Sequence, residues 1–171
     1  MPARKPTAAK LTAKSGTGAD AREQWLQLDR QLCFALYSSS LAMTKLYKPL
    51  LQPLGLTYPE YLAMLVLWES DGKAPISVGQ LGQRLSLDSG TLTPLLKRLE
   101  ALGHIERQRA ADDERRVDIA LTASGRKLRR QALDIPGQLA CAAACDLQEL
   151  AALTQRLHEL RSQLTAASTP A

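Results

Sequence analysis

The feature that most constrains the fold is a change of hydrophobic period at Gly103. Two short leucine-rich helices separated by a turn are expected before it, Ser77–Leu85 and Ser89–Leu102, with a serine able to cap the first. After it, residues 104–109 and 116–121 approach the alternation of apolar and polar residues that is typical of strands. The pattern therefore predicts a helix-turn-helix followed by a β-hairpin, with Gly103 ending the second helix.

Longer helices are expected on both sides of this segment. The expected spans are 20–50, closed by Pro49, Pro53 and Gly55; 58–70; 123 towards 145, interrupted near Pro136 and Gly137; and a last helix from Asp146. Leucines in the last helix step by three and four residues, which is typical of a helix that pairs with another. The first and last helices therefore form a predicted dimerisation region between two chains, the alternative being that they pack on their own domain.

Composition agrees with a mostly α fold that carries a small β-hairpin. Apolar residues make up 45% and aromatics 4% of the chain, which favours helices packed on helices. The net charge of +5 suits a polyanionic partner without identifying one. Residues 1–19 are expected to be a flexible basic tail, residues 20–57 and 123–167 dimerisation helices, and residues 58–122 a winged helix-turn-helix DNA-binding domain.

Other classes of protein are disfavoured. No stretch approaches the roughly 18 continuous apolar residues of a membrane span, and no secretory signal is present, so a cytoplasmic protein is expected. Three cysteines do not make a disulfide scaffold, and no group of Cys and His has zinc spacing. We expect no metal, no cofactor and no enzymatic activity.

The start of the second short helix is the predicted reader of DNA bases. The N-terminal residues of a helix in the major groove reach base edges best, and small side chains allow a close approach. Hydroxyls can bond bases or phosphates, and threonine and proline carbons can touch thymine methyl groups. The candidates are Ser89, Gly90, Thr91, Thr93 and Pro94, with Lys97 and Arg98 as phosphate contacts and Ser77 from the preceding helix. The alternative is an ordinary solvated helix face.

The hairpin is the second predicted contact with DNA. It contains Arg107, Arg109, Arg115 and Arg116, whose charges are balanced by acidic neighbours. The net charge of the hairpin therefore does not explain how it would bind DNA. We expect Asp113 to orient a nearby arginine while another, for which Arg115 is the first choice, enters the minor groove, where negative potential concentrates.

These motifs together resemble those of the MarR family of bacterial transcriptional regulators. The helix-turn-helix run LDSGTLTPLLKRLE at 87–100 and the Asp113-x-Arg115 pair of the hairpin are similar to the family's signatures. Within the family the resemblance is closest to the organic hydroperoxide resistance repressors. It rests on QLCFALYSSS at 31–40, YKPL at 47–50 and TYPEYL at 57–62, and spans about residues 27–165.

The resemblance implies that Cys33 senses organic hydroperoxides. A thiolate attacks the peroxide O–O bond and becomes a sulfenic acid, and apolar neighbours suit such an oxidant. Tyr37 lies one helical turn away, whereas Tyr47 is fourteen residues along, about 21 Å on one helix. Tyr47 of the same chain therefore cannot reach the sulfur. The resemblance implies that Tyr47 and Tyr58 approach the sulfur from the other subunit. The alternative is that Cys33 is a small buried hydrophobic residue and the tyrosines are core residues.

Cys141 and Cys145, expected four residues apart on one helix, are candidate resolving thiols for a disulfide between subunits. Cys141 is the preferred one, and the alternative is two small buried residues. The resulting prediction is a dimeric repressor that binds a palindromic operator when reduced and releases it when Cys33 is oxidised. Three alternatives stay open: release by a phenolic or aromatic ligand without cysteine chemistry, a thiol peroxidase, and a protein-interaction dimer with no role on DNA.

Overall fold

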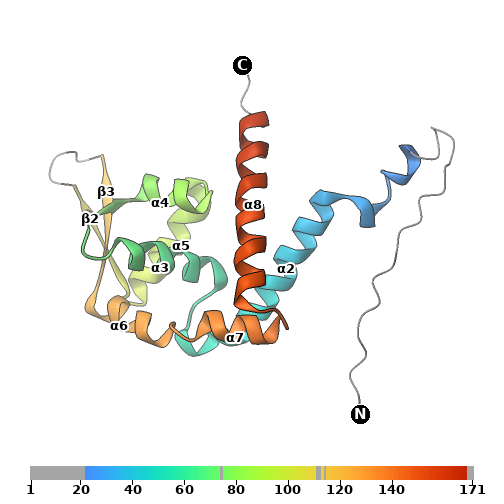
Figure 1. Cartoon of the computed structure of the whole chain (residues 1–171). Helices are drawn as coiled ribbons and strands as arrows, with labels where there is room; N and C mark the ends of the chain where they lie inside the picture. Colours follow the sequence, from blue (N-terminus) through green and yellow to red (C-terminus); the bar gives the residue numbers. More distant parts are fainter. Residues whose placement is uncertain (1–21, 74, 111–112, 114, 169–171) are drawn as a thin grey trace, which may run out of the picture. The chain divides into compact units, whose positions relative to one another are not determined.

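The computed structural model describes residues 22–73, 75–110, 113 and 115–168 (Figure 1). The predicted basic tail, residues 1–19, lies outside them. Internal contacts divide the chain into two compact units, Met1–Ala42 and Met43–Ala171. The first holds a short 3-10 helix, η1 (Leu28–Arg30), and the first half of α2 (Leu32–Leu51). The second holds the rest of α2 and every later element.

The first long helix begins later than predicted. Asp20 lies outside the described residues, and α2 starts only at Leu32, so a single helix from 20 to 50 is wrong. Gln31 has extended backbone angles, φ −83° and ψ 119°, which end η1 and separate it from α2. Pro49 also does not close the helix, because a proline this near the C-terminus removes only one of its last hydrogen bonds. The chain instead turns through η2 (Gln52–Leu54) and a left-handed Gly55, φ 67°.

Helix α3 (Tyr58–Ser70) follows the prediction and is the most buried helix of the described chain. Its N-terminus is a capping box, in which the Thr57 N–H donates to Glu60 Oε2 at 2.8 Å, with Pro59 in the first turn. Val66 and Trp68 are buried, whereas Leu65 remains 36% exposed. Helix α3 is apolar nearly all round, so one of its apolar faces stays outside the core.

The helix-turn-helix is confirmed. Helix α4 (Val78–Leu85) is capped by Ser77, and α5 (Ser89–Ala101) by Asp88. Ser86 takes the left-handed conformation in the turn between them, φ 55°. Gly103 does the same after α5, φ 72°, in the role predicted for it. Leu102, however, is 41% exposed and does not join the apolar side of α5.

The hairpin is confirmed, with one strand more than expected. Strands β2 (Ile105–Arg109) and β3 (Val117–Leu121) pair antiparallel, with Ile105 opposite Leu121 and Arg109 opposite Val117. A two-residue strand, β1 (Ile76–Ser77), pairs with the other edge of β3, giving the order β1-β3-β2. Two residues are too short for an alternating pattern to reveal, so sequence periodicity could not find this strand.

The C-terminal helices break earlier than predicted. Helix α6 (Ala123–Gln131), capped by Thr122, ends before Pro136, and α7 (Ile135–Ala142) carries that proline in its first turn. A proline is compatible with the first turn of a new helix, so it marks the start of α7 rather than a kink. Helix α8 (Leu147–Ser168) begins with a capping box, in which the Glu149 N–H donates to Asp146 Oδ1 at 2.7 Å and the Asp146 N–H donates to Glu149 Oε2.

The base of the hairpin is locked to α3 and α6 at Gly125. The indole N–H of Trp68 donates to the Gly125 carbonyl at 2.9 Å, and the Gly125 N–H donates to the Thr122 hydroxyl. A Cβ built on Gly125 would lie 2.1 Å from the His104 carbonyl oxygen, a backbone atom. Only glycine therefore fits where α6 crosses the start of β2.

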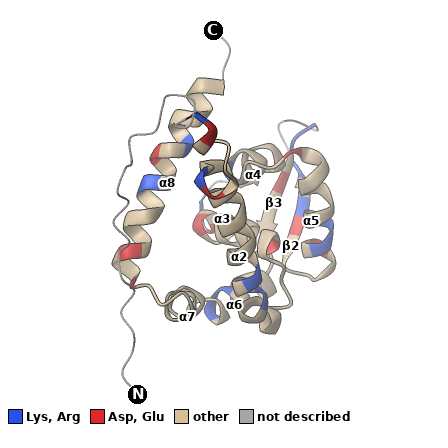
Figure 2. Cartoon of the chain, turned by 90° about the vertical axis from the view of Figure 1, so that its right-hand side faces the viewer, with Lys and Arg blue, Asp and Glu red and all other residues tan. Residues whose placement is uncertain are grey.

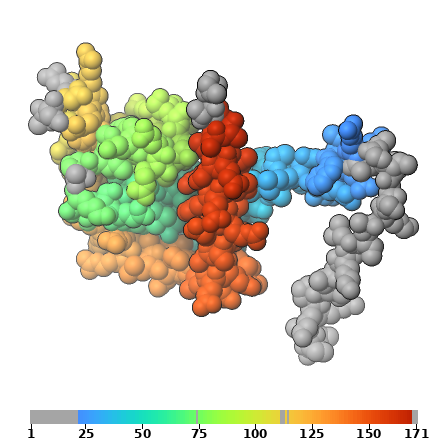
Figure 3. Space-filling model, turned by 45° about the horizontal axis from the view of Figure 1, so that its top comes forward, coloured from blue at the N-terminus to red at the C-terminus, as the bar shows by residue number. Residues whose placement is uncertain are grey.

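Helix α8, red in Figure 3, keeps most of its leucine seam exposed. Leu153, Leu157 and Leu164 are 55%, 40% and 53% exposed, while Leu150 and Leu160 are half-buried. A soluble chain does not usually leave such a row in water, so the seam fits a surface that another helix covers. Among the described residues, no helix is both long and apolar enough to cross a bilayer.

We predict that Gly125→Ala destabilises the protein by about 3 kcal/mol, at the upper end of the cost of overpacking a tight site. The new Cβ would have to displace the His104 backbone, which the hairpin holds. Gly137→Ala in α7 is the control, because a Cβ there meets nothing within 4 Å. Urea unfolding followed by circular dichroism measures both variants. Equal midpoints would show that the base of the hairpin yields freely.

Candidate functional site

The N-terminus of α5 presents the predicted base-reading residues to solvent. Ser89, Gly90, Thr91, Thr93 and Pro94 are all exposed, while the leucines of the same helix face the core. Asp88 fixes this end: its Oδ1 accepts from the Thr91 N–H at 2.8 Å and its Oδ2 from the Thr91 hydroxyl at 3.1 Å. The Thr91 backbone bond, above all, holds the pKa of Asp88 below its usual value. The hydroxyls of Thr91 and Thr93 donate within the helix and keep their acceptor lone pairs outward.

A hollow of about 520 Å³ lies between the start of α4, helix α5 and the hairpin. Six of the predicted DNA contacts line it: Ser77, Thr93, Arg107, Asp113, Arg115 and Arg116. They come from three segments well separated in the sequence. The fold therefore gathers them into one concave surface whose charged side chains come from the hairpin.

Two of the hairpin arginines also have protein partners. Arg107 donates from Nε at 2.8 Å and from Nη2 at 2.5 Å to Glu100 Oε2 on α5, and these bonds lower the pKa of Glu100. Arg116 pairs with Asp118 at 3.1 Å. In Figure 2 both basic and acidic residues are coloured on α5 and on the strands of the hairpin. Arg107 thus joins the hairpin to α5 and contributes to the spacing between them.

The tip of the hairpin is shaped by Asp113. Its carboxylate accepts from the Arg115 backbone N–H at 2.9 Å, and its carbonyl accepts from the Arg116 N–H at 2.9 Å. The predicted orienting role is thus seen on the backbone of Arg115 rather than on its guanidinium. Arg109 and Arg115 are exposed and have no ion pair among the described residues, which leaves both able to reach a phosphate or a groove.

The two cations predicted further along α5 differ from each other. Lys97 is exposed, with no ion-pair partner in the described part of the chain. Arg98 pairs through Nη1 with Glu60 Oε1 of α3 at 3.2 Å, and the Glu60 side chain is only 5% exposed. Arg98 therefore contacts the interior of its own domain, a partner that its position in the sequence did not reveal.

The three cysteines are free and exposed. Cys33 is the second residue of α2. Tyr37, which is 63% exposed, follows one turn further on. Cys141 is near the end of α7, but Cys145 lies beyond that helix, so their expected placement on a single helix is wrong. The chain leaves α7 in a Schellman motif: the Cys145 N–H donates to Ala140 and the Ala144 N–H to Cys141, with Ala144 left-handed at φ 52°.

The predicted sensor tyrosines Tyr47 and Tyr58 lie in direct contact. Their rings stack with centroids 4.7 Å apart, and Tyr61 packs against Tyr47 at 5.7 Å. Burial, followed by the neighbouring phenols, raises the pKa of Tyr47 to about 12, and burial raises that of Tyr58. Both hydroxyls are therefore protonated at neutral pH and can donate to a thiolate.

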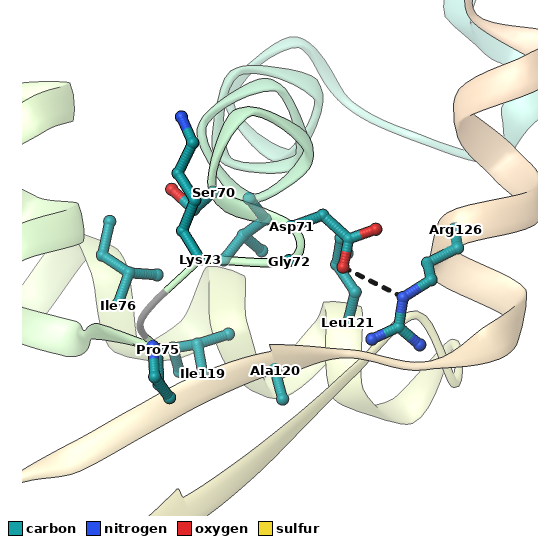
Figure 4. Close-up of a pocket in the computed structure, with 11 residues that line it drawn as sticks. Ser70, Asp71, Gly72, Lys73, Pro75, Ile76, Ile119, Ala120, Leu121 and Arg126 are labelled. Atoms are coloured by element: carbon teal, nitrogen blue, oxygen red, sulfur yellow. Dashed lines mark hydrogen bonds and ion pairs between the residues drawn. The ribbon is translucent and has the colours of Figure 1, made fainter.

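Two further hollows lie outside the surface between α4, α5 and the hairpin. One, of about 600 Å³, is bordered by Tyr58 and by three cations, Lys45, Lys48 and Arg98. The other, of about 120 Å³, lies beside β1 and β3 and is flanked by the Asp71–Arg126 ion pair, 3.0 Å (Figure 4). The first combines aromatic and cationic walls, as an anionic aromatic ligand requires. The second has only one ion pair at its rim.

Sequence reasoning missed three residues of this site: Glu60, Tyr61 and Glu100. Each acts through a partner distant in the sequence. The Thr57-x-x-Glu60 spacing of a capping box could have identified Glu60 as a helix cap, though not as the partner of Arg98. No local pattern connects Glu100 with Arg107, because the contact depends on how the hairpin folds back on α5.

Comparison with known proteins gives one consistent result. Residues 45–131 match the family model of the transcriptional regulators SarA/Rot. The chain is 48% identical over 139 residues, 81% of its length and 92% of the relative, to the organic hydroperoxide resistance transcriptional regulator of Bacillus subtilis. Its structure is similar to that of reduced AbfR bound to DNA, with TM-score 0.67, 31% identity and coverage of 84% of this chain and 99% of that one. The disulfide-formed AbfR is also similar, with TM-score 0.54, 33% identity and coverage of 83% and 98%.

We predict that Tyr47 is the last tyrosine to ionise. A raised pKa means that the folded state holds the Tyr47 proton more tightly than the unfolded chain does, so this contribution to stability is present below pH 10 and is lost as the pH rises towards about 12. Titration of the tyrosinate absorbance, in wild type and Tyr47→Phe, measures this. The variant should lack the most alkaline step. Loss of an earlier step instead would place Tyr47 in water.

Proposed function

Because the chain belongs to the MarR family of transcriptional regulators, in its organic hydroperoxide resistance group, we propose that it is a peroxide-sensing repressor whose switch is Cys33. It is a DNA-binding regulator and not an enzyme. In the proposed cycle the reduced homodimer binds a palindromic operator, and oxidation of Cys33 by an organic hydroperoxide releases it. The observation that carries the proposal is the exposed Cys33 thiol in a chain whose half-buried, protonated tyrosine pair can serve a second subunit.

The proposed DNA contact uses the hollow between α4, α5 and the hairpin. The N-terminus of α5 enters the major groove, where Ser89, Gly90, Thr91, Thr93 and Pro94 face the bases. Arg109 and Arg115 extend from the hairpin towards the adjacent minor groove. A solved structure of AbfR on DNA, similar in fold to this chain, supports this assignment.

The proposed homodimer places a second copy of the chain against the leucine seam of α8. Leu153, Leu157 and Leu164 are exposed at the spacing of a paired helix. Helix α2 also exposes two leucines, Leu32 and Leu41. A dimer also supplies what one chain lacks. Cys33 and Tyr47 of one subunit are separated by about 21 Å of helix, so in this proposal it is Tyr47 of the partner that reaches the sulfur.

The proposed chemistry is a two-electron oxidation of sulfur. The Cys33 thiolate attacks one oxygen of the hydroperoxide, the O–O bond breaks, and the alkoxide leaves and takes a proton to become an alcohol. The sulfenic acid then condenses with a second thiol, releasing water and forming a disulfide. Cys141 and Cys145, both exposed, are the candidates for that thiol, and the disulfide-formed state of AbfR supports such a step.

A second candidate function follows from the 600 Å³ cavity. Its wall joins Tyr58 with Lys45, Lys48 and Arg98, so an aromatic acid could bind there and release DNA without any sulfur chemistry. Such a ligand should act equally on a protein that lacks Cys33. A thiol peroxidase would be recognised by turnover with a reductant, and a protein-interaction dimer by the absence of operator binding.

We predict that stoichiometric cumene hydroperoxide lowers the operator affinity of the wild type about 5–150-fold, the usual range of coupling between two sites. Cys33→Ser should bind the operator as the reduced wild type does and ignore the oxidant, since serine cannot form a sulfenic acid. Fluorescence anisotropy on a labelled operator measures both. Release of the variant by peroxide would remove Cys33 from the mechanism. Release of the variant by salicylate would favour the ligand-controlled alternative.

We also predict that Arg115→Ala and Lys97→Ala each weaken operator binding and lower the salt dependence of log Kd by about one unit, as loss of one phosphate contact does. Arg130→Ala is the matched control, because it removes an exposed cation of α6, at the opposite end of β3 from the hairpin tip. Unchanged affinity and slope in both test variants would move the DNA contact elsewhere on the chain.

A further inference from the structure

Glu60 is the only charged residue that is buried among the residues the structure describes, at 3% exposure. Burying a carboxylate is costly unless its oxygens are bonded, and here each oxygen has a separate partner. Oε2 accepts from the Thr57 N–H at 2.8 Å, and Oε1 pairs with Arg98 Nη1 at 3.2 Å. One carboxylate thus joins the first turn of α3 to the recognition helix α5.

The same turn of α3 carries a proposed sensor residue. Tyr58 is the first residue of α3, two positions before Glu60, and its ring stacks on Tyr47. A shift of Tyr58 must therefore move the turn that holds Glu60, because the capping box with Thr57 fixes this turn as a unit. Arg98 lies two helical turns beyond Thr91, about 10 Å along α5 from the base-reading end.

We propose that Glu60 is a positioning residue that transmits the state of the tyrosine pair to the recognition helix through Arg98. This inference rests on the proposed function, since it assumes that a change at Cys33 displaces Tyr58. A helix in a packed domain moves as a rigid rod, so a displacement at Arg98 reorients the base-reading end of α5. Glu60 touches neither the sulfur nor the DNA; it acts only through Arg98.

The proposal differs from a purely structural role in one measurable respect. A contact that only stabilises the fold would change operator affinity of the reduced and oxidised proteins by the same factor. A contact that transmits the switch changes the ratio of the two affinities. The measured quantity is therefore the ratio of the operator Kd of the oxidised protein to that of the reduced protein.

The test compares Glu60→Gln, Arg98→Met and the double variant with the wild type. Glutamine keeps an oxygen for the Thr57 N–H and removes the charge that attracts Arg98. Arg84→Met is the matched control, because Arg84 joins α4 to Glu69 of α3 by an ion pair of 2.6 Å away from the tyrosines. Operator Kd is measured before and after one equivalent of cumene hydroperoxide, and free thiol is counted in each sample.

The ratio should fall about two- to thirtyfold in both single variants, the range by which residues along a coupling route act. The double variant should lose no more than the larger single loss, Arg84→Met should keep the wild-type ratio, and thiol oxidation should proceed in all. Wild-type ratios in Glu60→Gln and Arg98→Met, with their thiols oxidised, would overturn the inference alone. A wild type that is oxidised and stays on DNA would overturn the proposed function, and this inference with it.

Discussion

The burial of α3 is the constraint on which the rest of the structure depends. This helix packs against α4, α5, α6 and β3, so the helix-turn-helix and the hairpin are both placed relative to it. Its apolar residues Met64, Leu67 and Trp68 supply much of the core, and its polar contacts lie at its two ends. The Trp68 indole holds Gly125 at one end, and Glu60 holds Arg98 at the other. A domain built in this way keeps the hairpin and the recognition helix in a fixed relation as long as α3 stays seated.

That arrangement explains why a small chemical change could control DNA binding. The tyrosine pair contacts the N-terminal turn of α3, and Tyr61 of the same helix packs against both Tyr47 and Trp68. The aromatic contacts therefore continue from the proposed sensor to the base of the hairpin. Close-packed interiors do not deform smoothly, so displacement of one ring shifts the whole helix that carries it.

Much of this fold could be predicted from local sequence because its boundaries are set by local chemistry. Ser77, Asp88 and Thr122 cap the helices that follow them, and Gly103 ends α5, as their residue types and positions indicate. The errors occur where a boundary depends on backbone conformation that residue type does not reveal. Gln31 is extended without a glycine or proline to mark it, and Ala144 turns left-handed where glycine would be expected. Because Ala144 is left-handed, Cys145 lies outside the helix that was predicted to contain it.

The candidate site also has one part that residue types predict and another part that they do not. The exposure of the small, polar residues at the start of α5 was predictable, because the leucines of that helix mark the opposite face as the core side. The ion pairs Arg107–Glu100 and Arg98–Glu60 were not predictable, because an arginine that binds phosphate and one that binds a carboxylate have the same sequence signature. Arg115 and Arg107 differ only in what the folded chain brings to them, solvent for one and Glu100 for the other. Arg107 and Arg98 each hold an ion pair within the domain, so each contributes to the spacing between α5 and the elements packed against it, whereas their contact with DNA stays a prediction.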